Sequence, residues 1–180
     1  MNEVRLVPPG PEWERQFCDM AREWLGEDPR RVQKVLDDFG AYLDDLARQE
    51  DGSTLREGWV PSSSYWLVDG DDRILGTSRM RHRLTPALEL EGGHIGCDIR
   101  PSARGRGHGT TLLALTLEKA RQRGLDEVVI TCDEANLASA RIIEKNGGKC
   151  RGRGTSEQSG NPILRFRVDL QADGKPDRQY

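Results

Sequence analysis

Three alternating glycines form the most distinctive chemical feature of the chain. Gly105, Gly107 and Gly109 lie between an apolar segment and a long helical pattern. Glycine adopts positive φ and lets the backbone approach a ligand closely, and the first N–H groups of a helix attract anions at the positive end of its dipole. Arg104 and Arg106 add positive charge beside the turn. The sequence therefore predicts a phosphate-binding turn around residues 104–110.

Two common nucleotide-binding motifs do not match this turn. The motif G-x-x-x-x-G-K-[ST] requires a lysine, and none follows the glycines. The dinucleotide fingerprint requires G-x-G-x-x-G and an acidic residue at the end of the next strand, whereas Asp126 and Glu127 lie at that strand's beginning. An ordinary strand-to-helix turn remains the alternative for the glycines, and solvated surface side chains remain the alternative for the two arginines.

Regular elements on both sides must position the turn. A strand over 94–99 ends at Pro101, and 110–123 is the strongest helical pattern, with Gly124 as its C-cap. Upstream, a second helical pattern carries an apolar face from Val32 to Leu46 and is weakened by Gly40. The other predicted elements are strands at 3–7, 65–68, 73–84, 126–132, 149–154 and 162–170 and helices at 13–25 and 136–146. This order predicts an α/β (α+β) fold with antiparallel strands first and then one parallel crossover.

With Arg104, Gly107 and Gly109 the turn matches R-x-x-G-x-G, and here the chain resembles the GNAT superfamily of acyl-CoA-dependent N-acetyltransferases. The segment NLASARIIEKNGG (136–148) looks like the family's second motif, so the resemblance covers most of residues 3–170. The segments at 58–66 and 79–84 resemble an uncharacterised bacterial branch. The resemblance implies a mixed central sheet of about seven strands flanked by about four helices. The length of 180 residues and the lack of a repeat or second boundary predict a single domain over residues 1–171, and the terminal segment 172–180 is expected to be disordered.

The same resemblance implies acetyl-CoA as cosubstrate and no metal. Strands four and five of the family splay apart to admit the pantetheine arm, and Asn136 would face that cleft, although a plain helix N-cap is its alternative role. The residues expected to bind the cofactor are Ile99, Arg104, Gly105, Arg106, Gly107, His108, Gly109, Thr110 and Asn136.

Acetyl transfer to an amine needs a base, because a lysine-like amine with a pKa of about 10.4 reaches its neutral form at pH 7 at a cost of about 4.6 kcal/mol. In the family the neutral amine attacks the thioester directly. Candidates on the fourth strand are His94, Cys97 and Asp98. We favour His94, because imidazole titrates near neutral pH. Asp98 has the same strand parity as His94 and either orients a cationic substrate or pairs with Arg100.

One position departs from the family pattern. Many members carry a tyrosine seven residues after the motif's asparagine, where it protonates the leaving thiolate, but this chain has Ile143 there. Ser139 or a water molecule could replace it. The predicted function is N-acetyl transfer from acetyl-CoA to an amine of a small molecule or protein. The alternative is a non-catalytic acyl-CoA binding or sensing domain.

Composition excludes several other classes. Lys and Arg number 27 against 30 Asp and Glu, so a net charge of −3 argues against a nucleic-acid partner. No apolar run reaches the roughly 18 residues of a membrane span, and no leader pattern opens the chain, so we expect a cytoplasmic protein. The four cysteines are too dispersed for a zinc ribbon or a disulfide framework. Exposed edge strands would permit a homodimer.

Overall fold

A computed structural model describes residues 3–171, without the side chains of residues 30 and 31, and the tail predicted at 172–180 lies outside the described residues. Within this part of the chain, no helix combines the length and apolar composition that crossing a membrane requires. The elements are β1 (Arg5–Val7), η1 (Pro11–Trp13), α1 (Glu14–Trp24), α2 (Pro29–Asp37), α3 (Phe39–Asp51), β2 (Ser62–Val68), β3 (Ile74–Arg81), α4 (Pro86–Leu90), β4 (Ile95–Ile99), η2 (Pro101–Ala103), α5 (His108–Gln122), β5 (Glu127–Asp133), α6 (Leu137–Lys145), β6 (Lys149–Thr155) and β7 (Pro162–Asp169).

The strands form two sheets that meet at one point. One sheet has the order β1-β2-β3-β4 and the other β5-β7-β6, and each ladder within residues 3–171 is antiparallel. The predicted parallel pairing of β4 with β5 does not form a ladder. The two strands meet only just before β4, where the His94 N–H donates to the Val129 carbonyl at 2.7 Å. Beyond that bond the two strands pair with other neighbours, so a gap opens between them. The seven predicted strands are confirmed.

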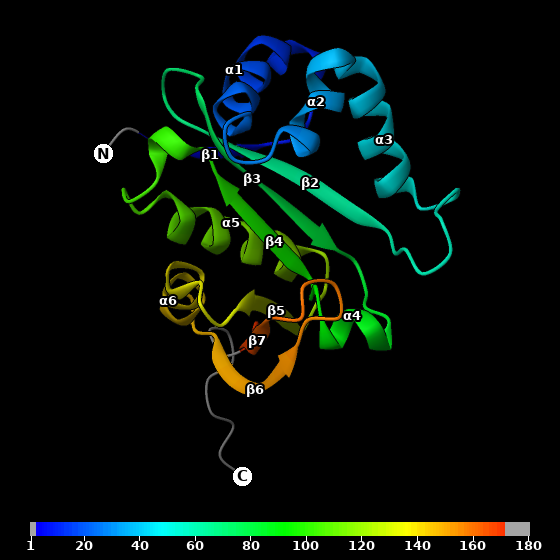
Figure 1. Cartoon of the computed structure of the whole chain (residues 1–180), viewed down its shortest axis with the longest axis vertical. Helices are drawn as coiled ribbons and strands as arrows, with labels where there is room; N and C mark the ends of the chain where they lie inside the picture. Colours follow the sequence, from blue (N-terminus) through cyan, green and yellow to red (C-terminus); the bar gives the residue numbers. More distant parts are fainter. Residues whose placement is uncertain (1–2, 172–180) are drawn as a thin grey trace.

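Helices cover the first sheet on both faces, as Figure 1 shows: α1, α2 and α3 lie over one face and α5 lies on the other. Alternating side chains explain this arrangement, because residues of opposite parity on a strand point to opposite faces. Trp66 of β2 is fully buried and packs with Phe17 and Phe39 under the first helices. On the other face Met80 and Ile95 pack with Leu113 of α5 in the core that continues to the second sheet.

The second predicted helix, which Gly40 was expected only to weaken, is interrupted between Asp37 and Phe39. The backbone leaves the helical region at Asp38 (φ −152°), whose carboxylate accepts a hydrogen bond from Ala41 N at 2.8 Å and so begins α3 as its N-cap. Gly40 lies inside the first turn of α3. The short helix α4 was not predicted. It begins after Thr85, which accepts from Leu88 N, with Pro86 in the first turn, a pattern that sequence reasoning can recognise.

Candidate cofactor and acceptor site

The turn between β4 and α5 has the shape that the glycines predict. Gly105 (φ 74°) and Gly107 (φ 85°) are both left-handed, and a Cβ on either would meet nothing within 4 Å. Gly109 has a different role, since a Cβ there would lie 2.7 Å from Ile142 Cδ1. Two glycines therefore shape the turn and leave open space above it, and the third allows α5 to pack closely against α6.

Unused N–H groups line this turn. Gly107 is the N-cap of α5 and provides no side-chain cap, and its carbonyl accepts from Thr110 N (3.0 Å) and Thr111 N (3.2 Å). The N–H groups of residues 105–109 donate to no acceptor within residues 3–171. Five consecutive donors at the positive end of a 15-residue helix can bind an anion. Thr110, by contrast, already uses its N–H within the turn.

The charged side chains around the turn do not all face the anion site. Arg104 donates to both carboxylate oxygens of Glu27, at 2.8 and 2.9 Å, and through Nε to the Ile99 carbonyl at 3.1 Å. This pair fastens the turn to the segment that follows α1. The side chain of Arg106 is exposed and His108 is half-buried.

A second connection joins α1 to the end of β4. Arg100 is 5% exposed and donates to Glu23 Oε1 through Nε at 2.9 Å and to the Ile74 carbonyl at 2.9 Å, and Ser102 N donates to Glu23 Oε2 at 2.9 Å. Burial alone would raise the pKa of Glu23, but the hydrogen bonds from Arg100 and Ser102 outweigh it and lower the pKa to about 2. The pairing of Asp98 with Arg100 that the sequence left open is therefore wrong: Arg100 is bound to Glu23.

The gap between β4 and β5 contains a cavity of about 300 Å³. Ile99, Gly109 and Asn136 line it, so the structure brings these three predicted cofactor residues together. Asn136 is also the N-cap of α6, with Oδ1 accepting from Ser139 N at 3.0 Å. Ile143 is 3% exposed and lines the same cavity. An apolar side chain thus occupies the position at which many members of the family carry the tyrosine that protonates the leaving thiolate.

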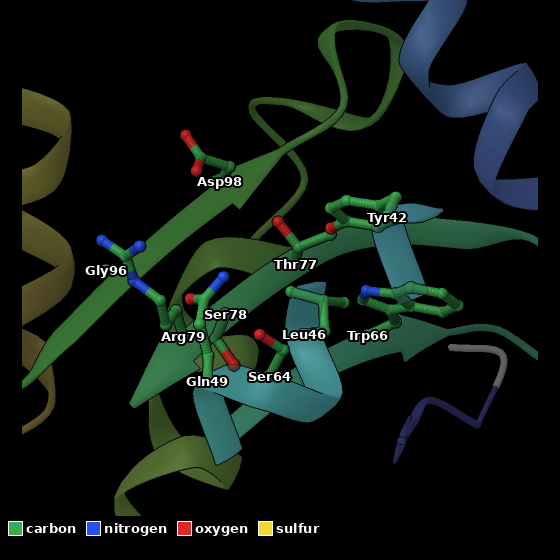
Figure 2. Close-up of a pocket in the computed structure, with 10 residues that line it drawn as sticks. All are labelled: Tyr42, Leu46, Gln49, Ser64, Trp66, Thr77, Ser78, Arg79, Gly96 and Asp98. Atoms are coloured by element: carbon green, nitrogen blue, oxygen red, sulfur yellow. The ribbon is translucent and has the colours of Figure 1, made fainter. Parts of the chain in front are cut away.

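A second cavity, of about 400 Å³, lies on the other face of the first sheet, beneath α3 (Figure 2). Sequence reasoning did not identify it, because its lining comes from four elements distant in the chain. The lining residues are Tyr42, Leu46, Gln49, Ser64, Trp66, Thr77, Ser78, Arg79, Gly96 and Asp98. Gly96 and Asp98 also line the cavity between β4 and β5. The two cavities therefore meet at β4.

His94 lies at the closed end of the gap between β4 and β5. Its Nδ1 accepts from Val129 N at 2.9 Å, so the neutral ring carries its proton on Nε2. Burial lowers the pKa of His94, and the nearby Arg81 lowers it further. His94 lines neither of these two cavities. The role of His94 as base stays a prediction. Before Nδ1 can accept a proton, the hydrogen bond that it accepts from Val129 N must break.

The thiols offer no base and no metal site. Cys97 lines the cavity between β4 and β5, but burial raises its pKa to about 12, so it stays protonated at neutral pH. All four cysteines are free thiols. Among residues 3–171, no group of three or more His, Cys, Asp or Glu side chains could hold a metal ion.

Comparisons with known proteins agree on one family. Residues 12–149 match the family model described as acetyltransferase (GNAT) domain. A mycothiol acetyltransferase of Beutenbergia cavernae is 31% identical over 144 residues, which are 77% of this chain and 46% of that protein. A mycothiol acetyltransferase of Thermobispora bispora is 29% identical over 130 residues, 69% of this chain and 41% of that protein. The chain thus spans less than half the length of these curated relatives.

Solved structures share the fold at low sequence identity. A ribosomal L7/L12 alpha-N-protein acetyltransferase in complex with coenzyme A superposes with a TM-score of 0.72, at 14% identity, over 94% of this chain and 96% of that one. A spermidine N-acetyltransferase from Vibrio cholerae in complex with CoA and spermine gives a TM-score of 0.66, at 12% identity, over 93% and 96%. These likenesses establish the architecture alone.

Proposed function

The chain belongs to the GNAT acetyltransferase family, and from that premise we propose that it transfers an acetyl group from acetyl-CoA to the amine of a small molecule or protein. The observation that carries the proposal is the meeting of two cavities at Gly96 and Asp98, one beside the anion-binding turn and one on the opposite face of the sheet. A thioester in the first cavity and an amine in the second would come together there.

The cofactor would be held mainly by backbone groups. The N–H groups of residues 105–109 would bind the pyrophosphate, and Ile99 and Asn136 would border the pantetheine arm in the gap between β4 and β5. Arg104 would contribute through its pair with Glu27, which fixes the turn. Arg106 lies in the same turn, and His108 and Thr110 lie at the start of α5, so these three residues would complete the predicted cofactor set.

The reaction would be direct attack of the neutral amine on the thioester carbonyl, with no acyl-enzyme. Asp98, which lines both cavities, would orient the ammonium group before it loses its proton. His94 remains the proposed base. Because it lines neither cavity, the proton would reach it through water, and the ring would accept it at Nδ1 after the bond from Val129 opens.

Departure of coenzyme A would proceed without the family's usual acid. Ile143 provides no proton, and Ser139 of the same helix contributes a hydroxyl to the cavity lining. We propose that the thiolate leaves with Ser139 or a water molecule beside it. Ile143 is also the observation that favours the second candidate, a domain that binds acyl-CoA without catalysis.

The test is release of free thiol from acetyl-CoA in the presence of a panel of amines. The name of the curated relatives makes the unacetylated form of mycothiol one acceptor to include, beside amino sugars, amino-acid amides, polyamines and peptides. Thiol release that depends on one class of amine supports the transferase. Tight acetyl-CoA binding with no release from any amine contradicts it and supports the binding domain.

Other partners stay predictions from sequence. The acidic charge balance continues to argue against a nucleic-acid partner, and the lack of a long apolar run in the sequence continues to argue against a membrane partner. The strands β1 and β6 lie at sheet edges, where a second copy could pair, and we propose a homodimer as the assembly to test. The cytoplasmic location and the domain boundary at residue 171 likewise remain proposals.

A further inference from the structure

The acceptor cavity beneath α3 has a lining that is polar and electrically balanced. Its only carboxylate is that of Asp98, and its only cationic side chain is Arg79, so the two formal charges cancel. Tyr42, Gln49 and Ser64 add neutral groups that can donate and accept hydrogen bonds. Such a lining suits a ligand with one cationic group and several polar groups rather than a ligand with several cationic groups.

One donor in this lining has no partner. Trp66 is fully buried, and its indole N–H donates to no acceptor within residues 3–171. The ring is held by Phe17 and Phe39, with centroids 4.6 and 6.2 Å away, so it cannot easily turn to find one. In Figure 2 the indole nitrogen lies on the side of the ring that faces Leu46 and the other lining residues. A buried donor without an acceptor is unfavourable, and a ligand oxygen would satisfy it.

The strand register places the indole of Trp66 in line with Asp98, where the two cavities meet. Trp66 of β2 lies opposite Thr77 of β3, and Thr77 lies opposite Asp98 of β4. Adjacent strands are about 4.8 Å apart, so Trp66 and Asp98 stand about 10 Å apart on one face of the sheet. A single small molecule can therefore place an amine at Asp98 and an oxygen at Trp66.

We propose that the acceptor is a monoamine that carries hydroxyl or carbonyl oxygens, and that one of these oxygens accepts the indole N–H of Trp66 after displacing the side chain of Leu46. A polyamine fits poorly, because its several ammonium groups would meet one carboxylate and one guanidinium, and an ammonium group has no lone pair to offer the indole. This inference rests on the proposed function and narrows its substrate class.

A spectroscopic experiment tests the contact directly. The chain has four tryptophans, and ¹⁵N labelling gives each indole N–H its own signal. The Trp66 signal is assigned by its absence in Trp66→Phe. We expect glucosamine, added to the protein saturated with coenzyme A, to move the Trp66 signal downfield, and we expect putrescine not to move it. A shift caused by putrescine and not by glucosamine would overturn the proposal, as would no shift at glucosamine concentrations that saturate acetyl transfer.

A kinetic comparison tests the consequence. We expect kcat/KM for glucosamine to exceed that for putrescine and spermine at least tenfold, and Trp66→Phe to lower it for glucosamine about tenfold, mostly through KM. Trp24→Phe is the control, because Trp24 is also buried (5% exposed) in the same cluster and does not line the cavity. It should leave the ratio between the acceptors unchanged.

The outcomes separate this inference from the proposed function. Preference for a polyamine, or an equal loss for all acceptors in Trp66→Phe but not in Trp24→Phe, would overturn the inference and leave the transferase proposal intact. Absence of thiol release with any amine would refute the proposed function, and the inference would fall with it.

Discussion

Glu27 binds Arg104 through two hydrogen bonds, of 2.8 and 2.9 Å, across 77 residues of sequence. The arginine that the glycine motif marks as a phosphate ligand is therefore tied to the segment after α1, on the acceptor side of the sheet. Glu23 makes the parallel connection to Arg100 and Ser102. The cofactor turn is thus held by α1 and the segment after it, which lie on the same side of the first sheet as α3 and the acceptor cavity.

The pair of Arg104 with Glu27 predicts that removing either side chain weakens coenzyme A binding to the same extent. Because Arg104 acts by fixing the turn, Arg104→Gln and Glu27→Gln should each weaken coenzyme A binding by less than tenfold, and the double variant should be no weaker than either single one. Calorimetric titration measures the three affinities. Lys34→Gln, which breaks the ion pair with Asp45 between α2 and α3, is the control. Loss of binding in Arg104→Gln with normal binding in Glu27→Gln would instead make Arg104 a direct ligand.

The open space above Gly107 predicts a position-specific loss of affinity. Gly107 and Gly124 share left-handed backbone (φ 85° and 86°), and a Cβ on either meets nothing within 4 Å. Leucine at either position should cost about 1–2 kcal/mol in backbone strain. Only Gly107→Leu should also raise the coenzyme A dissociation constant at least tenfold, because its side chain would occupy the pyrophosphate position. Equal affinities in the two variants would remove the turn from the cofactor site.

The base assignment predicts a particular pH profile. Burial lowers the pKa of His94 from its usual value of 6.5, so the acidic limb of kcat/KM should lie below pH 6.5. His94→Gln should abolish that limb and lower the plateau about 100-fold or more while coenzyme A affinity stays unchanged. Asp98→Asn should raise the KM for the amine and keep the limb. A limb that survives in His94→Gln and disappears in Asp98→Asn would identify Asp98 as the base.

The network around Glu23 predicts acid sensitivity of the fold. Its pKa falls from 4.5 to about 2, so the folded protein binds this proton less tightly than the unfolded chain does. The stabilisation is complete above pH 4.5 and is lost as the pH falls towards 2. Urea unfolding from pH 6 to pH 2 should show a shallower pH dependence in Glu23→Gln than in the wild type. Glu118→Gln, which removes a carboxylate from an exposed pair with Arg121, should keep the wild-type slope.

Local features were predictable and long-range ones were not. The turn at Gly105–Gly109 depends on backbone conformation encoded by adjacent residues, so its position and open shape followed from the sequence. The role of Asp38 as an N-cap was also encoded locally, although the only feature predicted there was a weakening of the helix at Gly40. In contrast, Glu23 and Glu27 reach residues 77 positions away, and no local pattern marks them as partners of Arg100 and Arg104.

The acceptor cavity depended on strand register. Trp66, Thr77 and Asp98 align only because β2, β3 and β4 pair as they do, and a shift by one residue would turn each side chain to the other face. Sequence alternation identified the strands but left their register undetermined. The interaction of His94 Nδ1 with Val129 likewise required knowledge of which residues meet where β4 and β5 begin to diverge.

Titration of acetyl-CoA into the purified protein by calorimetry, followed by addition of amines with a free-thiol readout, tests the central claim most directly. The account predicts one acetyl-CoA site with micromolar affinity, weakened at least tenfold in Gly107→Leu and not in Gly124→Leu, and thiol release that depends on an added amine. No acetyl-CoA binding to the wild-type protein would contradict the assignment of the turn at residues 104–110 and of the reaction built on it.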